Sequence, residues 1–148
     1  MSDHVRKQIR DAITTAVTGL TTTAGNVFPS RVYNLEKTKL PALLIYTNDE
    51  SSSVQTINLP RTTQRRLEVI IEAVAKSTTT LDDDLDTIIK EVETAMAGDV
   101  TFGGLSKDSM LTLIEIGLTG NGDQPTGNAK LTFTVEYYIL ENNPTVAI

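Results

Sequence analysis

The stretch FPSRVYNLEKTKLPALLIYTNDE, residues 28–50, decides the fold that the sequence predicts. It contains an apolar run, residues 40–47, that ends abruptly at a polar Asn-Asp-Glu triplet. Pro41 lies at the start of this run, where a strand tolerates a missing N–H group. Residues 42–46 are apolar at every position, so both faces of the strand would be covered. We therefore predict a central β-strand over residues 40–47.

Two segments carry apolar residues at helical spacing. The first helix is predicted over residues 3–22, and its stripe consists of Val5, Ile9, Ile13, Val17 and Leu20. The second is predicted over residues 81–97, with Thr80 as its N-cap residue and Gly98 at its end. Its stripe consists of Leu81, Leu85, Ile88, Ile89, Val92 and Met96. Each helix therefore has one face to bury against a sheet.

Alternating apolar residues predict three more strands, over residues 63–76, 110–119 and 129–141. A short edge strand is also expected over residues 32–35. The strand at residues 63–76 would pair antiparallel with the one at residues 40–47. These elements predict one α+β domain over residues 1–148, in the order α-β-β-α-β-β. Its four-stranded, mainly antiparallel sheet would carry both helices on one face.

Two polar segments are predicted to be irregular. Residues 48–62 are rich in serine and contain Pro60, so we predict a long loop, and residues 142–148 would form a short C-terminal tail. Loops of this length inside small domains are uncommon and are often functional. We therefore expect residues 48–62 to reach a neighbouring molecule.

Composition excludes several classes of protein. The chain has 148 residues and no cysteine, so it has no disulfide framework, thiolate zinc site or cysteine nucleophile. Its net charge is −6, whereas a protein that grips DNA phosphates is expected to be basic. No apolar run approaches the roughly 20 residues that span a bilayer, and the chain start does not resemble a signal peptide.

Candidate catalytic and metal-binding residues do not converge. His4 is the only histidine, and its place at a polar helix start is typical of a solvated side chain. The residues Asp82, Asp84, Asp86 and Glu93 have the spacing of a calcium loop, but Thr87 stands where that loop needs glycine. The same segment carries an unbroken helical stripe. The sequence thus predicts no catalytic residue, no cofactor and no metal site.

The best candidates for a functional surface are interface residues. They are Asp49, Glu50, Arg61, Arg65, Arg66 and Tyr138. The arginines would contact either phosphate or the acidic pair at residues 49–50, and the ionic contact is favoured because no aromatic platform accompanies them. Tyr138 faces away from the helices, which suits either a subunit interface or simple exposure.

A resemblance covers most of the chain. It is carried by Phe28, Arg31, Leu40-Pro41-Ala42 and the strand ending in Tyr46, and it continues in Gln64-Arg65-Arg66-Leu67-Glu68-Val69, Thr80-Leu81-Asp82 and the closing strand from Leu131 to Tyr137. In these features the chain resembles the tail terminator family of long-tailed bacteriophages, typified by tail protein U of phage lambda. None of the motifs is catalytic.

This resemblance implies a structural virion protein rather than an enzyme. A tail terminator forms a homohexameric ring on the end of the tail tube, stops tube elongation and presents the head-joining interface. Its partners would be the tail tube protein and a head completion or connector protein, and assembly would take place in the host cytoplasm. DNA would pass through an acidic or neutral lumen without specific binding, and no membrane is involved.

The resemblance also implies magnesium-assisted ring assembly, for which Asp49, Glu50 and residues 82–86 are possible sites. Two alternatives remain at this point: another neck protein, either a tail completion or a head–tail connector protein, and a small oligomeric α+β enzyme. The second lacks a cluster of acid–base residues in the sequence.

Overall fold

The computed structural model describes residues 3–29, 40–77, 79–119 and 126–148 of the chain. Two α-helices, one 3-10 turn and six strands make up these ranges. In chain order they are α1 Val5–Ala16, β1 Val27–Phe28, β2 Ala42–Val54, β3 Thr62–Lys76, α2 Leu81–Ala97, η2 Phe102–Gly104, β4 Asp108–Thr119, β5 Thr126–Leu140 and β6 Asn143–Ala147.

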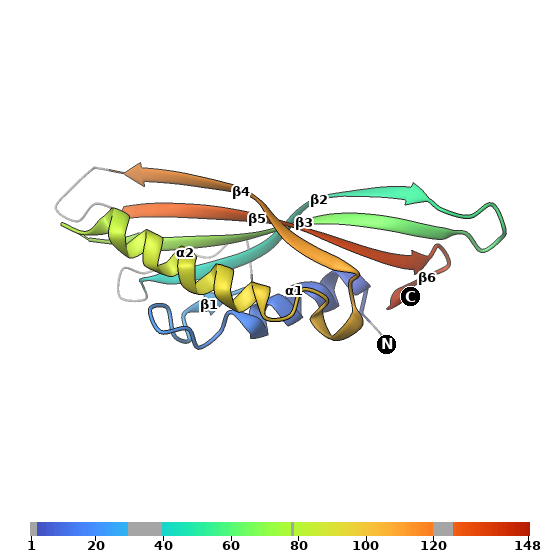
Figure 1. Ribbon diagram of the computed structural model, residues 1–148, viewed down its shortest axis with the longest axis horizontal. Coiled ribbons are helices and arrows are strands. Elements are labelled where there is room, and N and C mark those ends of the chain that lie inside the picture. The colour runs from blue at the N-terminus through green and yellow to red at the C-terminus, as the bar shows by residue number, and fades with distance from the viewer. Residues whose placement is uncertain (1–2, 30–39, 78, 120–125) are drawn as a thin grey trace.

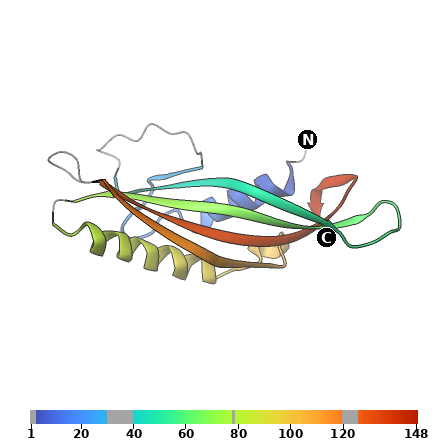
Figure 2. The same cartoon turned by 90° about the horizontal axis from the view of Figure 1, so that it is seen from above.

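The six strands form one mixed sheet, in the order β1-β2-β3-β5-β4, with β6 paired to β5. β1 runs parallel to β2, and every other pair is antiparallel. The sheet is twisted and curls around the helices (Figure 1, Figure 2). The predicted four-stranded sheet in the order α-β-β-α-β-β is therefore wrong. The two shortest strands, β1 and β6, were missed because two to five residues carry too little alternation to detect.

The core lies on one face of this sheet. Every second residue of β3 from Leu67 to Ala75 and of β5 from Gly127 to Ile139 is buried there, and both helices place their apolar stripes against these residues. The largest fully buried side chains on the strands are Leu43, Ile45, Leu67, Ile71, Leu131, Tyr137 and Ile139. α2 covers β3 and β5, whereas α1 lies against β2 and β6. The two helices together therefore close a single core.

The predicted central strand is β2, which is an interior strand of the sheet, although β3 and β5 make up the middle of the sheet. β2 lies between β1 and β3, and its apolar half, Ala42–Ile45, is buried. Its antiparallel pairing with β3 confirms the predicted hairpin. The expected edge strand at residues 32–35 lies outside the described residues.

One helix end differs from the prediction. α2 has the predicted bounds, but α1 ends at Ala16 rather than near residue 22. The hydroxyl of Thr18 donates to the carbonyl of Thr14, and Gly19 has a φ of 86°, which is favourable only for glycine. Threonines lower helix propensity, and the chain turns back at Gly19 to form a bridge between Leu20 and Ala24.

Residues 48–62 are mostly strand rather than loop. β2 continues to Val54 and β3 begins at Thr62, so only residues 55–61 join them. The resulting hairpin extends beyond the helices at one end of the molecule (Figure 1). We call residues 48–66 the arm. The predicted C-terminal tail is also ordered, because β6 pairs with the end of β5.

The core assignment predicts a large stability difference between two leucine-to-alanine variants. Leu131→Ala removes a fully buried side chain from the centre of β5 and should lower the free energy of unfolding by about 2–5 kcal/mol. Leu59→Ala changes an exposed side chain in the arm and should alter it by less than about 0.5 kcal/mol. Urea denaturation measures both, and equal effects would contradict the assignment.

Candidate functional site

A β-bulge decides where the acidic residues at the base of the arm point. Thr47 pairs with Val69, but Glu50 pairs with Leu67, so β2 contains one extra residue between these positions. A bulge of this kind shifts all following side chains to the opposite face. Asp49 remains exposed, whereas Glu50 turns toward the helix-covered face.

Glu50 is the centre of a partly buried polar network. Its side chain is only 8% exposed, and its Oε2 lies 2.6 Å from Arg6 Nη1 and 3.5 Å from Arg65 Nη1. The hydroxyl of Tyr137 donates to its Oε1. A buried carboxylate is stable only when it is paired and hydrogen-bonded, and these three partners meet that requirement.

The same network perturbs the titration of Tyr137. Burial raises the pKa of the Tyr137 phenol well above its ordinary value, and its hydrogen bond to the Glu50 carboxylate raises it further. The phenol therefore stays protonated and remains a donor at every physiological pH. Since the four side chains come from α1, β2, β3 and β5, the network ties the base of the arm to the helix layer.

The other predicted interface residues lie at the same end of the sheet. Arg61 pairs with Glu141 at 3.3 Å, and Arg66 Nη2 lies 3.9 Å from Glu136. Tyr138 is half-buried and accepts a hydrogen bond from Gln64. Of the predicted ionic contacts between the arginines and the acidic pair, the structure contains the one between Arg65 and Glu50. Glu50 itself is withdrawn from the surface.

The tip of the arm exposes apolar side chains. Ile57 is 93% exposed and Leu59 is 74% exposed, and Val54 is exposed beside them. The tip is closed by two hydrogen bonds, from the Gln55 amide to the Thr62 carbonyl and from the Thr62 amide to the Thr56 hydroxyl. These apolar residues therefore project from an ordered hairpin.

A second apolar surface follows β4, which was not among the predicted sites. Its exposed apolar side chains are Met110, Leu113, Ile114, Ile116 and Leu118. A bulge between Leu111 and Leu113 places some of them on each face of the strand. On its far side β4 pairs with no strand that the structure describes. The signal was present in the sequence, because this strand is apolar on both faces and yet nothing in the predicted fold covers it.

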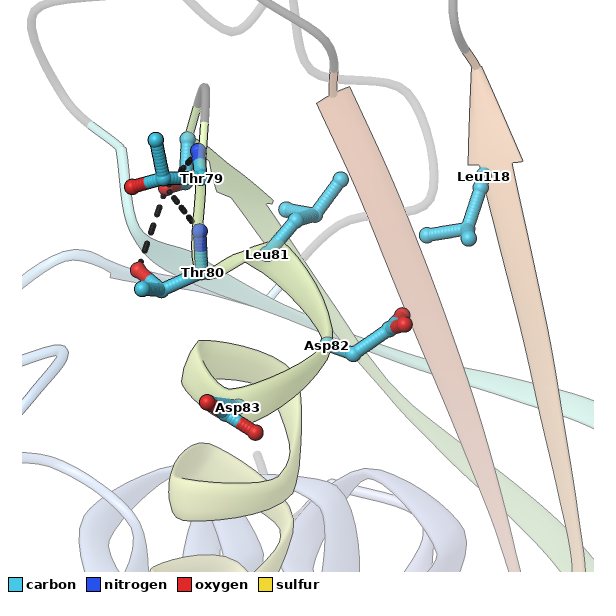
Figure 3. Close-up of a pocket in the computed structure, with 7 residues that line it drawn as sticks. Thr79, Thr80, Leu81, Asp82, Asp83 and Leu118 are labelled. Atoms are coloured by element: carbon cyan, nitrogen blue, oxygen red, sulfur yellow. Dashed lines mark hydrogen bonds between the residues drawn. The ribbon is translucent and has the colours of Figure 1, made fainter.

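Several pockets border α2, and two of them also involve residues of β4. One of about 360 Å³ lies at its start, between the Thr79-Thr80 turn and Leu118 of β4 (Figure 3). Ser77 Oγ accepts hydrogen bonds from the amides of Thr79 and Thr80 there. The other, of about 300 Å³, lies between the C-terminal half of α2 and the start of β4. Its lining is Glu93, Met96, Ala97, Val100, Ser109, Met110, Leu111 and Phe133.

The acidic start of α2 is helical, as the sequence predicts, and forms no calcium loop. The first turn contains Asp82, Asp83 and Asp84, which the helix dipole favours. Within the described ranges, no group of three or more His, Asp or Glu side chains is placed to hold a metal ion. Likewise, no helix in these ranges is both long and apolar enough to cross a membrane.

Comparisons with known proteins add no relationship. The chain matches no model of a protein family, and it matches no curated protein.

The Glu50 network predicts unequal effects for two neighbouring acidic residues. Glu50→Gln removes the charge that Arg6 and Arg65 share and should lower the free energy of unfolding by about 1–3 kcal/mol. Asp49→Asn, at an exposed position, is the matched control and should change it by less than about 0.5 kcal/mol. Chemical denaturation at pH 7 provides the comparison, and a Glu50→Gln variant as stable as Asp49→Asn would rule out the network as a structural anchor.

The stability that the His4 cap gives to α1 should depend on pH. Its Nδ1 accepts a hydrogen bond from the Arg6 amide at 3.0 Å and so caps the helix. Burial, and then the Arg6 charge, lower the pKa of His4, so protonation is easier in the unfolded chain. The contribution of His4 to the free energy of unfolding should therefore be complete above about pH 6.5 and should decrease as the pH drops below that value.

His4→Asn keeps a side-chain acceptor at the cap without a group that titrates in this range. The thermal midpoint of the parent should decline more steeply between pH 7 and 5.5 than that of His4→Asn. Parallel curves would show that His4 does not contribute through its protonation.

Proposed function

We propose that this chain is a structural, ring-forming virion protein of the tail terminator type. The observation that carries the proposal is the edge of β4, which is long, exposes large apolar side chains and pairs with no further strand among the described residues. The sequence resemblance is the reason for proposing a terminator ring in particular, and the exposed surfaces of the fold give a physical reason for the copies to assemble.

Soluble monomers protect the edges of their sheets. They use short strands, lysine, proline or a covering segment, because an open edge pairs readily with other chains. β4 has 12 residues, contains none of lysine, arginine or proline, and exposes five large apolar side chains. An edge of this kind is expected to be covered by a neighbouring subunit.

The arm and the β4 edge are different surfaces on one molecule. A contact that joins two different surfaces is head-to-tail, and its repetition produces a ring if the rotation closes. A terminator needs such a ring, because it must cover the end of a tube and leave a channel. Its partners are then other copies of the chain in a homohexamer, the tail tube protein and a head completion or connector protein.

The electrostatics suit a channel for DNA. The net charge of −6 disfavours binding to phosphates, so DNA would pass through the ring without specific contact. Asp49 and the acidic start of α2 are the candidates for a lumen surface, since Glu50 is buried. Assembly takes place in the host cytoplasm before the protein enters the neck of the virion.

An enzyme is the weaker alternative. The Glu50 network contains two arginines that neutralise its carboxylate, and the phenol beside it remains protonated. Neither group is prepared to act as a base or nucleophile. The second alternative is another neck protein of similar shape, and only a functional experiment distinguishes it from a terminator.

The test combines sizing with electron microscopy. Purified protein, with and without magnesium, should form closed rings by light scattering and negative staining, and it should cap the ends of isolated tail tubes. Phage assembled without the protein should contain uncontrolled long tubes. Normal-length headless tails would identify a connector instead, and a protein that stays monomeric even with tubes would contradict the proposal.

A charge on the β4 edge should prevent assembly. Ile116→Lys places an ammonium group on a 54% exposed position of β4, where it opposes edge pairing without disturbing the core. Val146→Lys, at a 50% exposed position of β6, is the matched control. Both variants should keep the parental thermal midpoint, and only Ile116→Lys should lose rings. Loss of rings in both, or in neither, would argue against the β4 edge as the interface.

A further inference from the structure

We infer that the arm tip of one copy docks in the apolar pocket between α2 and β4 of a second copy. The arm tip is residues 54–61, and the pocket is the one lined by Met96, Val100, Met110, Leu111 and Phe133. This contact rests on the proposed ring and specifies which two surfaces of the chain form it.

The pocket is suited to aliphatic side chains. Its volume is about 300 Å³, its lining is mainly apolar, and Glu93 is its only charged residue. Met110, 53% exposed, stands at its rim, and Val100 is also partly open to solvent. Burying apolar side chains against these residues would stabilise the contact by about 25 cal/mol for each Å² removed from water.

The arm tip has the complementary chemistry. Ile57 and Leu59 are two of the most exposed apolar residues that the structure describes. Residues 51–60 contain no charged side chain, and Arg61 follows directly after them. Arg61 is already paired with Glu141 of its own chain, so the match lies in the two aliphatic side chains, which suit an apolar pocket.

The occupant cannot be the arm of the same molecule. β2 and β3 remain paired from the core to Val54 and Thr63, and β5 continues beside them to Leu140. This three-stranded extension directs the tip away from α2, toward the opposite end of the molecule (Figure 1, Figure 2). The arm must therefore find its pocket on another molecule.

The occupant we propose is the arm tip of a second copy. Copies with a net charge of −6 repel each other over most of their surface, so a contact between them is least opposed where both sides are nearly uncharged. The arm tip, with no charge in residues 51–60, and the pocket, with Glu93 as its one charged residue, form such a pair. Each copy offers one of each, and the pocket includes Met110 and Leu111 at the start of β4. Docking would therefore place the arm beside the open β4 edge.

Cysteine cross-linking tests the contact directly, because the chain contains no cysteine. Ile57→Cys with Met110→Cys in one chain, treated with a short thiol-specific cross-linker under ring-forming conditions, should give a ladder of covalent oligomers. Ile57→Cys with Val146→Cys is the control, since Val146 is about as exposed as Met110 but lies on β6. It should give at least tenfold less cross-linked product.

A mixing experiment tests the direction of the contact. The Ile57→Asp/Leu59→Asp variant keeps its pocket, and the Met110→Asp variant keeps its arm. Each alone should remain monomeric with a parental thermal midpoint, whereas an equimolar mixture should give one-to-one dimers and no rings. Only an arm-to-pocket contact predicts dimers that do not grow into larger oligomers.

The outcomes separate this inference from the proposed function. Two results would overturn the inference but not the proposed ring. The first is parental rings without a preferential cross-link between residues 57 and 110, and the second is rings formed by either aspartate variant. Failure of the parent to assemble under every condition, including with tail tubes, would overturn both. Cross-linking of the arm to a tube subunit instead of a second copy would also contradict the inference.

Discussion

The pairing of β3 with β5 is the constraint on which the rest of the structure depends. Fifteen consecutive residues of each strand are in register, from Thr62 opposite Leu140 to Lys76 opposite Thr126. The pairs from Leu67 to Lys76 lie under the helices, and the five pairs from Thr62 to Arg66 belong to the arm. Because the same two strands form both, the arm is a rigid extension of the core. A rigid arm loses little conformational entropy when it docks, which favours its use as an assembly element.

The change from core to arm takes place at Glu50. Before the bulge, β2 faces the helices with the apolar side chains of Leu43 and Ile45. Beyond the bulge it presents the Glu50 carboxylate to Arg6, Arg65 and Tyr137. A buried ion pair contributes little net stability compared with an apolar contact of similar size, but it accepts only one geometry. The network thus fixes the direction of the arm relative to α1 more than it strengthens the fold.

The parts of the fold that follow local pattern could be predicted from the sequence. The bounds of α2 and the strand at β3 follow from apolar periodicity, which each segment carries within itself. The arm could not be predicted, because the polar residues 48–54 are typical of a loop and become a strand only by pairing with β3. The bulge that buries Glu50 depends on how β2 pairs with β3, and the spacing of apolar residues in the sequence does not reveal this pairing. The six predicted interface residues nevertheless lie together at the arm end of the sheet. The β4 edge was missed although its strand is apolar on both faces in the sequence, because that pattern does not show whether a strand lies at the edge or inside a sheet.

In the proposed ring, a head-to-tail contact joins the arm of one copy to the β4 side of the next. A cryo-electron microscopy reconstruction of the protein on the end of a tail tube would reveal this contact. We expect six-fold symmetry, with each arm lying along β4 and α2 of its neighbour. Arms that project freely, a two-fold contact of β4 with β4, or a ring of three, five or twelve copies would contradict it.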